Sequence, residues 1–212
     1  MANFLHGLRG NVGLRRWSAV VGESLPFQSA SAAQRMIAST KIGTPVLLVN
    51  IVVFQAGWFA CVLGAAHGRP WLGLPVVAMI VCGWLMSAPR PSALAQLTVL
   101  SGLVGFSWDS WLTVSGMIGY APGPLSPPLA PLWILALWLL FATTLSVSLR
   151  WLQTKLLLAA LLGALAAPLS YYAAARMGAL TLLRVQPALW AQAVGWALFL
   201  PLLLRLARRL DA

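Results

Sequence analysis

The sequence predicts an all-α integral membrane protein, a bundle of about six transmembrane helices with both termini in the cytoplasm. The chain of 212 residues is 60% hydrophobic and only 8% charged, with a mean hydropathy of +0.86. Soluble domains carry about 25% charged residues. Apolar runs of about 20 residues, the length that crosses a bilayer, follow one another between proline- and glycine-containing breaks. Basic residues lie beside the ends of these runs, where they set membrane topology.

The positions of the basic residues also indicate whether the partner is nucleic acid or the lipid bilayer. The net charge of +11 is compatible with nucleic-acid binding, but the basic residues are not gathered on a polar domain. We therefore expect the bilayer as partner and no nucleic acid. The two cysteines, Cys61 and Cys82, fall inside predicted spans, where thiols usually pack, so no metal site is expected.

Residues 1–44 differ from the rest of the chain and predict a basic, disordered cytoplasmic arm. Glycines interrupt any continuous amphipathic helix there, and the basic side chains suit anionic headgroups. An alternative is that translation begins at Met36 and that the arm is a start-site artefact. The basic residues of the arm are Arg9, Arg15, Arg16, Arg35 and Lys41.

Residues 45–209 predict a six-helix transmembrane domain. The second span is at the short end of the usual range. The connection at 121–130 is rich in proline and uncharged, and we expect it on the outer side. The predicted spans are 46–66, 71–88, 94–118, 131–149, 156–176 and 187–205.

The basic residues choose the orientation of this domain. With the N-terminus inside, eleven basic residues are cytoplasmic and three are not. Without the arm the bias is still six against three. The six are Arg90, Arg150, Lys155, Arg205, Arg208 and Arg209, and the three are Arg69, Arg176 and Arg184.

Asp109 is the main candidate for a functional residue. It is one of three acidic residues in the chain and the one that lies deep in a predicted span. An acid at membrane depth is costly unless it is neutral, paired or hydrated, so a functional and a structural role are both plausible. Helical spacing puts it on a face of small and polar residues that we expect to turn toward other helices. This face comprises Gly102, Gly105, Asp109, Thr113, Gly116 and Tyr120.

Other polar side chains reach a similar depth, at about 1.5 Å per residue. Gln55, Thr143 and Thr144 share the layer of Asp109, and Gln55 has to find its own partner. Hydroxyls of this kind usually bond to the carbonyl one turn earlier. Asn50 lies on a seam with Phe54, Gly57, Cys61 and Gly64, which favours a hydrogen bond between helices.

Further candidates to face a substrate or partner are aromatic or hydroxyl-bearing. Trp108 and Trp111 lie too deep to be interfacial anchors, so they predict packing or ligand contact. Ser170 and Tyr171 follow Pro168, which frees a backbone carbonyl that either hydroxyl, or that of Tyr172, could satisfy.

The sequence lacks the motifs of several enzyme classes. There are no clustered histidines for a di-iron site, no aspartate-rich magnesium motif and no Gly-x-Ser-x-Gly elbow. There is no glycine-rich nucleotide loop after a strand, because no strand is predicted. We expect no cofactor. An enzyme built on this chain would have to use Asp109 for proton transfer on an apolar substrate.

Four stretches of the sequence carry a resemblance to a known family: residues 50–61, 131–145, 148–152 and 168–171. Together they resemble a bacterial inner-membrane family catalogued as domain of unknown function 2878. The resemblance covers roughly residues 46–180 and implies a small multi-pass protein of the inner membrane with no established activity. It also implies genes for fatty-acyl or isoprenoid modification nearby, because members of the family tend to lie beside such genes.

Three hypotheses of function follow. The favoured one is an accessory, non-catalytic membrane protein that partners lipid-modifying enzymes. The second is a proton-coupled carrier or flippase for a lipid-like substrate that uses Asp109. The third is a lipid isomerase or cyclase with Asp109 as its acid.

Overall fold

A computed structural model describes residues 43–120 and 129–211 of the chain. The predicted arm and most of the proline-rich connection lie outside the described residues. The described part contains six α-helices, one short 3-10 helix and two short strands. Their bounds are α2 Thr44–Ala66, α3 Gly73–Ser87, α4 Pro91–Val114, β1 Ile118–Tyr120, α5 Leu132–Leu145, η1 Arg150–Leu152, α6 Leu156–Arg176, β2 Leu180–Leu182 and α7 Val185–Asp211.

The helices begin and end at the residues that usually mark helix boundaries. Pro45 and Pro91 occupy the first turns of α2 and α4, where a missing N–H costs nothing. Gly116 and Gly178 lie two residues after the ends of α4 and α6, and their φ angles of 66° and 87° suit glycine. In both turns the next residue, Met117 or Ala179, donates back to the fifth preceding carbonyl. This is the Schellman arrangement that reverses the chain after a helix.

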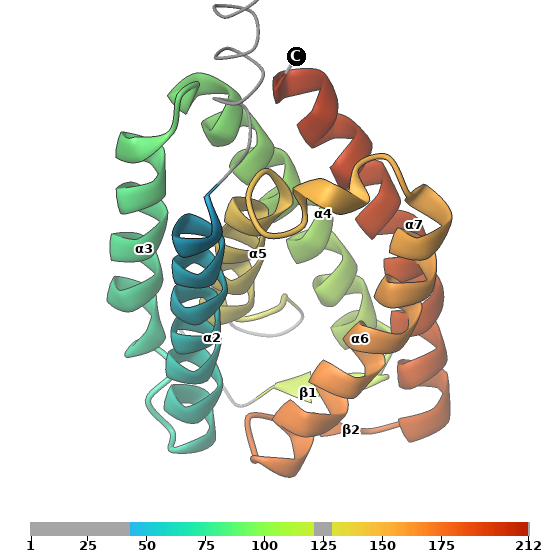
Figure 1. Ribbon diagram of the computed structural model, residues 1–212. Helices are drawn as coiled ribbons and strands as arrows, with labels where there is room; N and C mark the ends of the chain where they lie inside the picture. Colours follow the sequence, from blue (N-terminus) through green and yellow to red (C-terminus); the bar gives the residue numbers. More distant parts are fainter. Residues whose placement is uncertain (1–42, 121–128, 212) are drawn as a thin grey trace, which may run out of the picture. The chain divides into compact units, whose positions relative to one another are not determined.

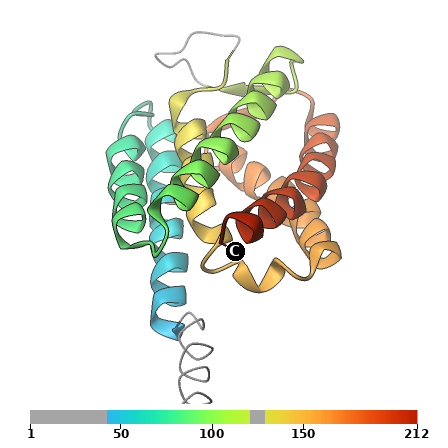
Figure 2. The same cartoon turned by 90° about the horizontal axis from the view of Figure 1, so that it is seen from above.

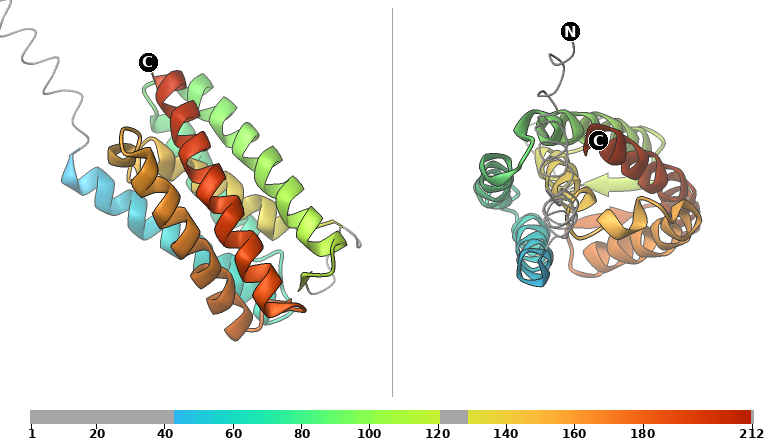
Figure 3. Two further views of the ribbon diagram at one scale, coloured as in Figure 1. Left: turned by 90° about the vertical axis from the view of Figure 1, so that its right-hand side faces the viewer. Right: turned by 45° about the horizontal axis from the view of Figure 1, so that its top comes forward.

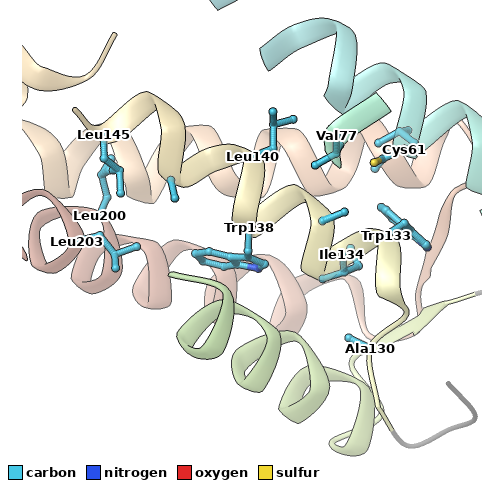
Figure 4. Packing of buried hydrophobic residues seen from close by; sticks show 14 of the residues in the cluster. Cys61, Val77, Ala130, Trp133, Ile134, Trp138, Leu140, Leu145, Leu200 and Leu203 are labelled. Carbon is cyan, nitrogen blue, oxygen red and sulfur yellow. The ribbon is translucent and has the colours of Figure 1, made fainter. Parts of the chain in front are cut away.

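The centre of the domain is α5. Trp133, Ile134, Trp138 and Leu140 are all nearly inaccessible, and α5 packs against α2, α3 and α4. Figure 4 shows Trp138 and Leu140 pointing to different sides of the helix. A helix that is apolar on every side needs such a buried position.

The last two helices form an antiparallel hairpin. A Cβ atom at Gly163 of α6 would overlap the backbone of Trp196 on α7, so the helices approach closely at a glycine. α7 also packs against α4, where Gly195 leaves room for the ring of Trp108. Figures 2 and 3 show this hairpin on the opposite side of α5 from α2 and α3.

The expectation that the chain has no strand is wrong. β1 and β2 pair antiparallel, with Gly119 opposite Thr181 and Tyr120 opposite Leu180. Each strand has three residues, which is too short to produce an alternating pattern in the sequence. The pair joins the chain after α4 to the chain after α6 at one end of the domain (Figure 1).

The small-residue face predicted for the third span is confirmed for its first three residues, which lie on α4 and are buried. Gly102, Gly105 and Asp109 are buried, and a Cβ at either glycine would collide with a side chain of α5. The last two members of the face are not helical, because α4 ends at Val114. Gly116 lies in the turn that follows and Tyr120 in β1.

Three of the six described helices, α2, α6 and α7, are long and apolar enough to cross a membrane. α3 and α5 are apolar but shorter, and α4 has 24 residues with a polar face. The start of α2 and the end of α7 lie at the same end of this domain, opposite the strands (Figure 1).

Candidate functional site

The Asp109 side chain is enclosed by three hydrogen-bond donors from three other segments. Its Oδ2 accepts from Nε1 of Trp138 on α5 at 2.7 Å. Its Oδ1 accepts from the hydroxyl of Tyr171 on α6 at 2.6 Å and from the hydroxyl of Tyr120 on β1 at 3.0 Å. The carboxyl group has no exposed surface. These contacts supply the partners that an acid in an apolar domain requires.

The chemistry of the donors limits how this carboxyl can hold a proton. An indole N–H can only donate, so Oδ2 must accept in every protonation state. A tyrosine hydroxyl donates and accepts. If Asp109 is protonated, the proton therefore belongs on Oδ1, between Tyr120 and Tyr171. The ionised carboxylate accepts all three hydrogen bonds. In the neutral acid, the proton on Oδ1 is donated to a tyrosine oxygen, so one of the two tyrosine bonds runs in the opposite direction.

Gln192 of α7 is the fourth polar neighbour. It is fully buried and lies beside both Asp109 and Tyr171. Its Oε1 accepts from Nε1 of Trp108 at 3.4 Å, which turns its Nε2 away from that ring. Nε2 has no hydrogen-bond partner among the described residues. The polar cluster therefore retains an unused donor on the side of α7.

A cavity of about 100 Å³, part of it open to the outside, lies next to this cluster. Most of its wall is aromatic, so it is called the aromatic cavity below. Ser170 and Tyr171 are the two hydroxyl-bearing residues of its lining. The aromatic residues of the lining are Phe54 and Trp58 of α2, Trp133, Trp138 and Phe141 of α5, Tyr171 of α6 and Trp196 of α7.

The aromatic walls are packed against one another. The rings of Trp138 and Trp196 stack with centroids 4.6 Å apart and planes 17° apart, and Phe141 meets Trp196 edge-on at 5.0 Å. Such contacts stabilise a pair by about 0.5–1.5 kcal/mol beyond the burial of area. The wall is therefore stiff, although it joins separate helices.

Two residues connect the aromatic cavity with the acid. Trp138 and Tyr171 line the cavity and also donate to Asp109. Asp109 itself does not belong to the lining. Any effect of the carboxyl on a molecule in the cavity therefore passes through one of these two side chains.

The structure puts Asn50, Thr143 and Thr144 at a contact between α2 and α5. Asn50 is fully buried, and its Nδ2 donates to the carbonyl of Thr143 at 3.4 Å, which is the interhelical bond expected for it. The two threonine hydroxyls donate to carbonyls three residues earlier, at 2.7 Å in each case. None of these three residues belongs to the Asp109 cluster.

The remaining candidates separate into two groups. Ser170 lines the aromatic cavity, and Tyr171, rather than satisfying the carbonyl freed by Pro168, donates to Asp109. Gln55 is exposed on α2 and Trp111 is 47% exposed on α4. Trp108 is half-buried against α7 and holds Gln192.

The sequence reasoning did not select Tyr120, Gln192 or Trp196 as site residues. Gln192 could have been selected from the sequence, because an amide side chain in the middle of an apolar run needs a hydrogen-bond partner. Tyr120 was placed on the correct side of Asp109 by helical spacing, although the chain reaches it through a turn and a strand. Trp196 carried no signal that distinguishes it from a packing residue.

Replacing Asp109 tests whether its hydrogen bonds support the fold. Asp109→Asn can still accept from Trp138 through its oxygen and donate to a tyrosine oxygen, so we expect a loss of about 1 kcal/mol. Asp109→Leu leaves three buried donors without an acceptor, and we expect a loss of about 3 kcal/mol or more. Unfolding of the purified protein in mixed micelles measures both. Equal stability of the two variants would contradict this account.

The comparisons with known proteins identify one family. No curated protein and no solved structure matches the chain. One family model matches residues 47–202, which include all the residues of the Asp109 cluster and the aromatic cavity. The chain therefore belongs to the family described as Protein of unknown function (DUF2878).

Proposed function

We propose that this protein binds a lipid-like molecule in the aromatic cavity and acts as a non-catalytic partner of enzymes that modify membrane lipids. The observation that carries the proposal is the cavity itself, which is apolar, partly open and formed by side chains from α2, α5, α6 and α7. Apolar pockets with a few polar groups are the usual form of ligand sites. Molecules that reach such a site from a bilayer are lipids.

The six helices are proposed to cross the bacterial inner membrane, with the N-terminus and the C-terminus in the cytoplasm. Arg90, Arg150 and Lys155 lie at the same end of the domain as the terminus of α7, as the positive-inside rule requires. α3 and α5 span only about 22 Å at 1.5 Å per residue. α5 is surrounded by other helices, so its length does not have to match the bilayer.

Two features support a binding role over a catalytic one. Asp109 is enclosed by protein donors and does not line the aromatic cavity. Apart from Ser170 and Tyr171, the lining consists of aromatic and aliphatic side chains, which bind by contact and do not transfer groups.

A second candidate function, proton transfer to or from a bound lipid, is favoured by one contact. Tyr171 belongs to the cavity lining, and its hydroxyl lies 2.6 Å from Oδ1 of Asp109. A hydroxyl that accepts a proton from Asp109 while releasing its own proton to a substrate would serve a carrier or an isomerase. The acid would then act through Tyr171, not directly on the substrate.

Filling the aromatic cavity tests the binding proposal. The full chain, purified in detergent, is labelled with palmitic acid that carries a photoreactive diazirine. We expect labelled peptides from α2, α5 and α6. Ala174→Phe projects a ring from the lining and should reduce this labelling about tenfold, equivalent to 1.4 kcal/mol.

The matched control is Leu169→Phe, which adds a ring on the same helix at a position that is 68% exposed. It should leave labelling unchanged. Labelling that is spread over outer helix faces and is insensitive to Ala174→Phe would disprove a lipid site in the cavity.

The orientation has its own test. Single cysteines are placed at His67 and Asp211, which lie at opposite ends of the domain, in a chain without Cys61 and Cys82. An impermeant thiol reagent added to intact cells should label the His67 site and not the Asp211 site. The reverse pattern would show that the orientation is inverted.

A further inference from the structure

We propose that Tyr171 is the polar recognition point of the aromatic cavity, and that the molecule bound there is a single-chain lipid with a hydroxyl or carboxylic acid group. This inference rests on the proposed lipid binding and specifies the chemical class of the ligand. The lipid chain lies among the aromatic rings, and its polar group bonds to Tyr171.

The first argument is the hydrogen-bonding capacity of Tyr171. A tyrosine hydroxyl has one proton to donate and lone pairs that accept. Its proton is used on Oδ1 of Asp109 at 2.6 Å. While Tyr171 donates to Asp109, what it can offer a ligand is an acceptor oxygen, which selects a ligand that donates. Among lipid groups, alcohols and protonated carboxylic acids meet this requirement.

The second argument is the position of the hydroxyl-bearing residues within the lining. The two hydroxyl-bearing side chains, Ser170 and Tyr171, are consecutive residues of α6. The walls from α2 and α5 present aromatic and aliphatic side chains. The cavity therefore has one polar side and one apolar side, which is the distribution of an amphiphile and not of a plain hydrocarbon.

Tyr120 supplies a matched control. It donates to the same oxygen of Asp109 as Tyr171 does, at 3.0 Å against 2.6 Å. It does not belong to the cavity lining. Changing either tyrosine to phenylalanine removes one donor from Asp109, but only Tyr171→Phe also changes a residue of the cavity lining.

The experiment measures quenching of tryptophan fluorescence by two probes that differ in one group. The probes are 9,10-dibromooctadecan-1-ol and 9,10-dibromooctadecane, whose bromines quench the cavity tryptophans on contact. Binding to the full chain in detergent is expressed against the probe's mole fraction in the micelle. We expect the wild type and Tyr120→Phe to prefer the alcohol about fivefold, and Tyr171→Phe to bind the two probes equally.

Each outcome decides a different point. Equal binding of both probes to the wild type overturns the polar recognition point and leaves lipid binding intact. Loss of the preference in both tyrosine variants also overturns it, because the effect would then come from Asp109. If neither probe quenches the wild type above its effect on free tryptophan in the same micelles, the proposed lipid binding itself is wrong. The wild-type comparison decides even if a variant does not fold.

Discussion

The hydrogen bonds that enclose Asp109 are the constraint on which the site depends. A carboxyl group in an apolar domain is costly unless donors surround it, and these donors come from β1, α5 and α6. The acid therefore ties the α6–α7 hairpin to α4 and α5 at the level of the aromatic cavity. The strand pair makes the same connection at the end of the domain. Asp109 fixes the positions of Trp138 and Tyr171, and these two side chains form part of the cavity wall.

Most of the fold was predictable from the sequence because membrane helices depend on local features. Long apolar runs and the prolines and glycines between them predicted helices close to where they lie. The predicted fourth span, 131–149, was too long, because α5 ends at Leu145 and turns and η1 follow. The strands were missed because three residues are too few for a periodic pattern.

The site was predictable only in part, because it depends on which helices are neighbours. Depth along the helices placed Gln55 in the layer of Asp109, yet Gln55 is exposed. Depth along a helix does not show which helices are neighbours, so it could not predict that Trp138 and Tyr171 both contact Asp109. Gln192 was identifiable in principle as a polar residue in an apolar run. The contacts of Asp109 required the tertiary arrangement, in which a turn at Gly116 brings Tyr120 back to the acid.

The most direct test of this account is a double-mutant cycle between Asp109→Leu and Tyr171→Phe, scored by the free energy of unfolding in mixed micelles. A hydrogen bond between the two side chains predicts a coupling of about 1 kcal/mol or more. The control cycle uses Tyr172→Phe, because Tyr172 is the next residue on α6 and is 49% exposed. It should show additive effects. Additivity between Asp109 and Tyr171 would contradict the claim that the acid holds α6 in place.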